Sequence, residues 1–133
     1  MKFVDSNVLV YAADDTDVEK HERALSIIER AMRGEFIISA QVLNEFSSVL
    51  YKKLRKSDDE VERYLKTFSL LSVVPVKSEY TLEAVRIKRR YDIQFFDSVL
   101  LATAVANGCD EFWSEDLNDG QMYGSVKAVN PFK

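Results

Sequence analysis

Four acidic residues stand in apolar surroundings, where an isolated charge is costly. Asp5 lies in the stretch FVDSNVLVYA, and Glu45 borders the apolar stripe of a helical segment. Asp97 begins the apolar stretch DSVLLATAVA, and Asp116 follows the stretch EFWS. An unpaired carboxylate in a dry core needs a partner, water or a metal ion. Ligands that are all oxygen favour Mg²⁺ or Mn²⁺ over zinc, which prefers His and Cys. If the four acids converge, they indicate a divalent-cation site.

Each acid also has an ordinary structural interpretation. Asp5 and Asp116 could each cap or occupy a turn, and Glu45 could pair with a basic side chain. Asp97 could complement the dipole of the helix that it begins. Convergence of all four would be repulsive without a cation, so the positions of the acids in the fold decide between the interpretations.

Apolar periodicity predicts alternating strands and helices. Strands are expected at Lys2–Val4, Glu35–Ser39, Ser72–Val76, Glu111–Ser114 and Val126–Val129. Helices are expected at Asp17–Arg33, from the N-cap Ser39 through Leu50, from a capping box at Ser57 and Glu60 through Phe68, at Ser78–Arg90 and at Gln94–Asn107. The apolar run around Asp5 resembles one buried strand, and Pro75 suggests that its own strand lies at a sheet edge or ends there.

This alternation predicts an α/β fold, a parallel sheet with helices on both faces and a single domain over residues 1–133. In such sheets reactive groups gather outside the carboxyl ends of the strands. Asp5 and Asp116 follow two strands and are expected at that edge. Glu45 and Asp97 lie on helices that begin after strand ends or loops, which could bring them to the same place.

Composition limits the class of protein. The 133 residues are 47% hydrophobic and 30% charged, as in a soluble globular domain, and charges interrupt every apolar run before it reaches membrane-spanning length. A secretory signal is not expected, and the single cysteine, Cys109, fits a reducing cytoplasm. The only histidine, His21, lies in the charged segment EKHER and is expected at the surface.

The net charge of −4 does not favour nucleic-acid binding by bulk electrostatics. Two basic clusters stand out against it, at 52–56 (KKLRK) and 86–90 (RIKRR). Each could be a solvated helix face or could hold a phosphate backbone beside an acidic cleft.

The four acidic motifs together resemble those of the PIN-domain ribonucleases, and most of all the VapC-type toxins of toxin–antitoxin pairs. The motifs are FVDSNVLVYA, SAQVLNEF, FFDSVLLATA and SEDLNDG, and the resemblance covers essentially the whole chain. It implies a three-layer α/β/α fold with a parallel sheet of about five short strands. It also implies a cytoplasmic, Mg²⁺- or Mn²⁺-dependent endoribonuclease that hydrolyses RNA phosphodiesters with metal-activated water.

The same resemblance assigns roles to residues of this chain. Asp5, Glu45, Asp97 and Asp116 would be the catalytic and metal-binding acids, with Glu45 acting directly or through water. Asn7 and Ser114 would support them.

One position departs from the pattern. Many relatives carry a second Asp two residues after the last acid, where this chain has Asn118; Asp119 is the neighbouring candidate.

The resemblance also implies two protein partners. Relatives usually form homodimers, and the C-terminal segment of a cognate antitoxin fills their cleft.

Other functions are compatible with parts of the pattern. A haloacid-dehalogenase-like phosphohydrolase would need an Asp where Asn7 stands, and a response-regulator receiver would need a phosphoacceptor Asp near Pro75. A PIN-domain nuclease of RNA processing, or a non-catalytic PIN-like binding module, also remains open.

Overall fold

The computed structural model describes residues 1–133, and its strands form one sheet in the order β3-β2-β1-β4-β6-β5. The strands are β1 (Lys2–Val4), β2 (Phe36–Ser39), β3 (Ser72–Val74), β4 (Glu111–Trp113), β5 (Met122–Tyr123) and β6 (Val126–Val129). Five of them pair in parallel, and only β5 is antiparallel to its neighbour β6. The α/β class and the parallel sheet predicted from the sequence are therefore confirmed.

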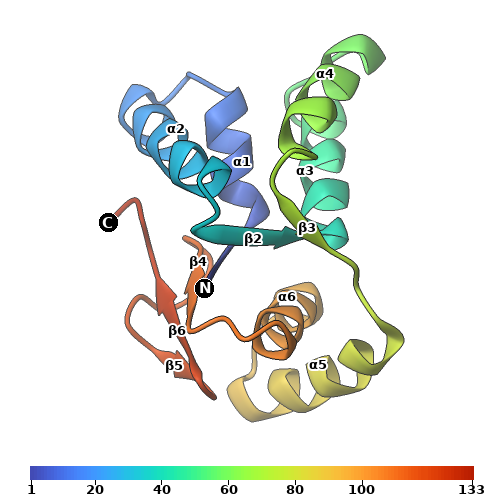
Figure 1. Cartoon of the computed structure of the whole chain (residues 1–133), viewed down its shortest axis with the longest axis vertical. Coiled ribbons are helices and arrows are strands. Elements are labelled where there is room, and N and C mark those ends of the chain that lie inside the picture. The colour runs from blue at the N-terminus through green and yellow to red at the C-terminus, as the bar shows by residue number, and fades with distance from the viewer.

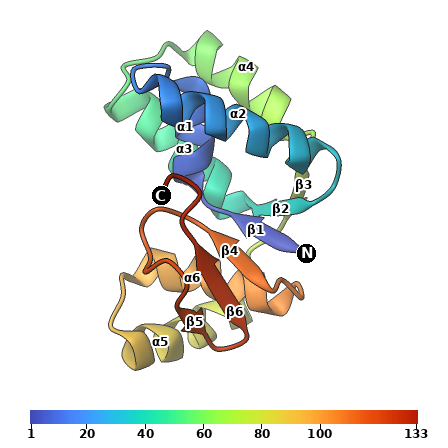
Figure 2. The ribbon, with the colours of Figure 1, turned by 90° about the vertical axis from the view of Figure 1, so that its left-hand side faces the viewer.

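Six helices cover the sheet. They are α1 (Ser6–Ala13), α2 (Val18–Met32), α3 (Ala40–Lys52), α4 (Asp58–Phe68), α5 (Ser78–Tyr91) and α6 (Phe95–Ala106). Figures 1 and 2 show α1 to α4 on one side of the sheet and α5 with α6 on the other. The three layers expected from the sequence are present. None of the helices has the length and apolarity needed to cross a membrane.

The centre of the sheet is the most buried part of the molecule. Phe3 of β1, Phe36 of β2 and Phe112 of β4 are fully buried. The rings of Phe3 and Phe112 stack with their centroids 5.2 Å apart. Parallel strands that are covered on both faces read as continuous apolar runs, which is why these short segments were recognisable. The buried strands give the carboxyl edge of the sheet a rigid base.

The first apolar run is not one strand, and this corrects the expectation from the sequence. Strand β1 ends at Val4, and Asp5 is the N-cap of α1, with a carboxylate oxygen 2.6 Å from the backbone N–H of Ser6. Valine-rich segments favour strands, but the burial of Val8 and Leu9 against the core outweighs that propensity. Asp5 consequently stands at the junction of strand and helix, at the carboxyl edge of the sheet.

Two further differences concern short strands. Strand β3 ends at Val74, two residues earlier than expected, and lies at the sheet edge that Pro75 suggested. The two-residue strand β5 was not predicted, because two residues show no periodicity. It pairs with β6 through a turn in which Gly124 has a φ of 64°.

The turn between α3 and α4 depends on a capping box at Ser57. Its hydroxyl accepts the backbone N–H of Glu60 at 3.2 Å, and the Glu60 carboxylate accepts the backbone N–H of Ser57 at 3.3 Å. We expect Ser57→Ala to lower the free energy of unfolding by about 1 kcal/mol, because an orphan helix N–H loses its acceptor. Urea denaturation measures this. The matched control is Ser78→Ala, at the exposed start of α5, and an equal loss in both variants would contradict the capping role.

Candidate active site

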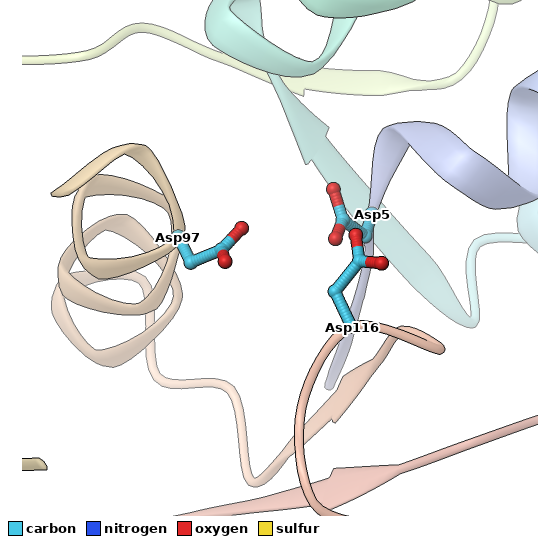
Figure 3. Close-up of side chains that lie close together, drawn as sticks. All are labelled: Asp5, Asp97 and Asp116. Atoms are coloured by element: carbon cyan, nitrogen blue, oxygen red, sulfur yellow. The ribbon is translucent and has the colours of Figure 1, made fainter. Parts of the chain in front are cut away.

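Three of the four predicted acids converge at the carboxyl edge of the sheet. One carboxylate oxygen of each of Asp5, Asp97 and Asp116 lies within 4.8 Å of the others (Figure 3). Asp5 follows β1, Asp116 follows β4, and Asp97 lies in the first turn of α6. We call these three residues the Asp triad. Neighbouring parallel strands supply two of its members, as the sequence predicted, and a helix on the other side of the sheet supplies the third.

Glu45 lies beside the triad, on α3. It lines a hollow of about 470 Å³ together with two triad members. We call this the acidic hollow; its walls are Glu45, Asp92, Ile93, Gln94, Asp97, Asp116 and Leu117. Ser39 positions α3, because its buried hydroxyl accepts the backbone N–H of Val42 at 3.3 Å and so caps the helix. The structure therefore brings all four predicted acids to one place.

Ser114 and Asn7 hold two of the triad carboxylates in position. The fully buried Ser114 hydroxyl donates to Asp5 Oδ2 at 2.7 Å and accepts the backbone N–H of Asp116 at 3.0 Å. Asn7 Nδ2 lies 3.1 Å from both Ser114 Oγ and Asp116 Oδ2. These bonds fix Asp5 relative to Asp116 before any ligand arrives, and they place both residues where the sequence analysis expected supporting groups.

The acids have no basic partner. No Lys, Arg or His nitrogen lies within 4.0 Å of the carboxylates of Asp5, Glu45, Asp97 or Asp116. Asp5 is only 2% exposed, and its burial raises its pKa to about 7, although hydrogen bonds from Ser114 and Ser6 oppose the rise. The cluster therefore lacks the protein cations that usually neutralise buried carboxylates.

The pKa values of two neighbouring acids, Glu45 and Asp97, are raised as well. Burial, followed by the negative charges of Asp5 and Asp97, raises the pKa of Glu45 to about 7. Burial and the charge of Asp116 raise the pKa of Asp97 to about 6. Carboxyl groups that hold protons near neutral pH are groups whose charge a bound cation would stabilise.

The donor set fits a hard divalent cation. Asn7 Oδ1 and Glu45 Oε2 are buried and have no hydrogen-bond partner. Such orphaned oxygens are costly unless a ligand satisfies them. Together with the triad they form an all-oxygen site of the kind that Mg²⁺ or Mn²⁺ occupies, and no cysteine or histidine lines the acidic hollow.

Asp119 lies outside this cluster. Its Oδ1 accepts the backbone N–H of Asn130 at 2.8 Å, and its Oδ2 lies 3.9 Å from the ammonium group of Lys133. Asn118 Nδ2 donates to Gln121 at 2.8 Å instead of contacting the triad. Asp119 therefore holds the C-terminal segment and does not extend the acidic site.

The sequence analysis did not identify a second polar network beside the triad. Glu115 accepts the Tyr11 hydroxyl at 2.6 Å and pairs with Lys20 at 3.0 Å. These bonds fasten the loop that carries Asp116 to α1 and α2. Tyr11 and Lys20 are far from Glu115 in the sequence, so no local pattern predicts this network. The one sequence feature that pointed to Glu115 is its position next to Asp116.

His21 differs from its expected surface position. It is half-buried, and its Nδ1–H donates to the backbone carbonyl of Tyr11 at 2.8 Å. A carbonyl can only accept, so Nδ1 of His21 carries a proton in this contact.

Comparison with known proteins agrees with this geometry. The PIN domain family model matches residues 2–118. Ribonuclease VapC24 of Mycobacterium tuberculosis (strain CDC 1551 / Oshkosh) is 29% identical over 148 aligned positions, covering 98% of this chain and 97% of that protein.

Two solved structures have the same fold. A toxin–antitoxin complex from Klebsiella pneumoniae superposes with a TM-score of 0.69 at 19% identity, over 98% of each chain. FitAcB from Neisseria gonorrhoeae gives 0.71 at 17% identity, over 99% of each. These findings set aside the dehalogenase-like and receiver alternatives. By its sequence, its fold and its four converging acids, the chain belongs to the PIN-domain family.

Proposed function

We propose that this protein is a Mg²⁺- or Mn²⁺-dependent endoribonuclease and the toxin of a type II toxin–antitoxin pair. The observation that carries the proposal is the Asp triad, with Glu45 beside it and no basic side chain to neutralise it. Similarity to ribonuclease VapC24 supports the choice of RNA as substrate.

Each acid then has a role. Asp5, Asp97 and Asp116 would hold the cation, and Glu45 would contribute directly or through water. When bound, a divalent cation lowers the pKa of water and offsets the charge that builds on a phosphodiester during attack. Glu45 Oε2 is buried without a partner, and its carboxyl has a pKa of about 7. A bound cation would lower that pKa, so the carboxylate would be ionised near neutral pH and its unpartnered oxygen would be free to accept a proton from the attacking water.

Ser114 and Asn7 act by position. Their hydrogen bonds keep Asp5 and Asp116 close despite the repulsion between the carboxylates. A preorganised set of ligands needs little rearrangement when the substrate phosphate arrives.

We further infer an antitoxin that covers the acidic hollow and a homodimer in the cytoplasm. The Klebsiella pneumoniae structure with this fold is a toxin–antitoxin complex, which supports the first partner. Exposed apolar side chains support the homodimer. Leu82 on α5 is 59% exposed and Phe96 on α6 is 56% exposed, and a second copy of the chain packed on these helices would remove both from water.

A cleavage assay on labelled single-stranded RNA tests the activity. With Mn²⁺ or Mg²⁺ we expect the wild type to cut internally, and EDTA to abolish cutting. Asp5→Asn and Asp97→Asn should each lower the rate about 100-fold or more, because each removes a charged ligand. Asp15→Asn is the matched control, since Asp15 is exposed and lies outside the cluster. Cleavage that persists equally in all variants would reveal a contaminant and refute the proposal.

The stability of the cation-free protein should fall as the pH rises. The pKa of Asp5 rises from 3.8 to about 7 on folding, so between these values the native state binds more protons than the unfolded state. Its stabilising contribution is therefore complete below pH 4 and is lost as the pH rises through 7. In EDTA we expect the free energy of unfolding to fall from pH 5 to pH 8.

Urea denaturation across this range compares the wild type with Asp5→Asn. The variant should show a shallower decline, and Mn²⁺ should restore stability to the wild type most strongly at pH 8, where the carboxylates are charged. Parallel pH profiles of the free energy of unfolding for the two proteins would contradict the raised pKa of Asp5.

The toxin assignment predicts an effect on growth. Induced synthesis of the wild type in a bacterial host should stop growth, whereas Asp97→Asn made to the same level should not, because it lacks one cation ligand. Colony counts after induction measure this. Normal growth with an enzyme that is active in the cleavage assay would favour a PIN-domain nuclease of RNA processing instead.

A further inference from the structure

A second hollow adjoins the Asp triad, between α1 and α3. It encloses about 360 Å³, within the range of roughly 300–1,000 Å³ typical of small-molecule sites. We call it the α1–α3 pocket. The lining residues that matter for its chemistry are Val10, Tyr11, Val49, Lys53, Leu54 and Glu115.

The α1–α3 pocket is continuous with the catalytic acids. Asn7 and Asp116 line it, and these two side chains are hydrogen-bonded to each other at 3.1 Å. Asp116 also lines the acidic hollow on its other side. A nucleotide seated in the pocket would thus place its neighbouring phosphate at the acids.

The walls of the pocket match a nucleobase. Val10 of α1 and Val49 and Leu54 from the α3 side are partly buried apolar residues that can contact the face of a base. Glu115 is held by the Tyr11 hydroxyl, which donates to its Oε1, and by Lys20, which donates to its Oε2. A carboxylate oxygen can accept more than one hydrogen bond, so Glu115 keeps acceptor capacity for the amino group of a base.

Charge separates the two hollows. Four carboxylates line the acidic hollow, and no Lys or Arg does, so it suits cations and repels a phosphate chain. The α1–α3 pocket is lined by three carboxylates, Asp14, Glu115 and Asp116, and by the ammonium group of Lys53. Lys20 pairs with Glu115, and the exposed neighbours of Lys53 in the basic cluster 52–56 add positive charge beside the pocket. Positive charge therefore stands on the α1–α3 side of the triad and none lines the acidic hollow, so a phosphate backbone is better accommodated on the α1–α3 side.

We propose that the α1–α3 pocket binds one unpaired nucleotide of the RNA substrate next to the scissile phosphate. Lys53 contacts the backbone, and Glu115 favours bases with an exocyclic amino group over uracil. The inference rests on the proposed ribonuclease function and adds a site that selects the base at the cut.

Binding can be measured without cleavage in the Asp97→Asn background. Fluorescence anisotropy in Mg²⁺ gives the affinity for labelled single-stranded oligo(A), oligo(C) and oligo(U). Each RNA is about twelve nucleotides long, within the roughly 4–16 nucleotides that one single-strand-binding domain covers. We expect oligo(A) and oligo(C) to bind at least threefold more tightly than oligo(U). Adding Lys53→Ala should weaken all three and reduce the slope of log affinity against log salt by about 0.7.

The matched control is Lys52→Ala, a neighbouring exposed lysine that does not line the pocket, with an expected change of less than twofold. Glu115→Gln should bring the three affinities within twofold of each other, and Lys53→Arg should restore binding. Thermal midpoints verify that each variant is folded.

Equal losses in Lys53→Ala and Lys52→Ala, or a base preference unchanged in Glu115→Gln, would overturn the proposal. So would variants that lose antitoxin binding while their RNA affinity stays intact, because the pocket would then receive a protein side chain. If the wild type cut no RNA in the cleavage assay but this binding pattern held, the ribonuclease function would fail and the nucleotide site would stand.

Discussion

Carboxylates that converge at one sheet edge repel one another, and this repulsion constrains how the strands and hydrogen bonds around them are built. Three Asp side chains place oxygens within 4.8 Å of one another, and no protein cation neutralises them. A fold tolerates such a cluster only if its backbone is rigid and its hydrogen bonds are fixed. The buried strands β1 and β4 supply the rigidity, and Ser114 and Asn7 supply the hydrogen bonds.

The architecture turns this unfavourable cluster into a site with two different sides. α3 and α6 border a hollow with four carboxylates and no basic residue, whereas α1 and α3 border a pocket that has apolar residues and one lysine beside its carboxylates. Asp116 belongs to both. In the proposed function, cation and nucleotide would occupy separate surfaces that meet at the Asp116 carboxylate.

The sequence predicts the acids well because a charge in an apolar run is visible without a structure. Asp5 and Asp97 stand out for that reason, and parallel strands explain why they meet. The bond between Asn7 and Ser114 joins residues 107 positions apart, so no local pattern reveals it. Helix α1 escaped prediction because its valine-rich segment fits strand and helix periods alike, and burial decided the outcome. Glu115 shows no signal beyond its neighbour Asp116.

The central claim is that the Asp triad, with Glu45 beside it, holds a divalent cation. Crystals grown with Mn²⁺ test it most directly, through an anomalous difference map collected with wild type and with Asp5→Asn. The account predicts a strong peak between Asp5, Asp97 and Asp116 in the wild type, with carboxylate oxygens at about 2.0–2.3 Å, and a weak or absent peak in the variant. A wild-type map with no peak at the triad, or with the same peak in Asp5→Asn, would contradict it.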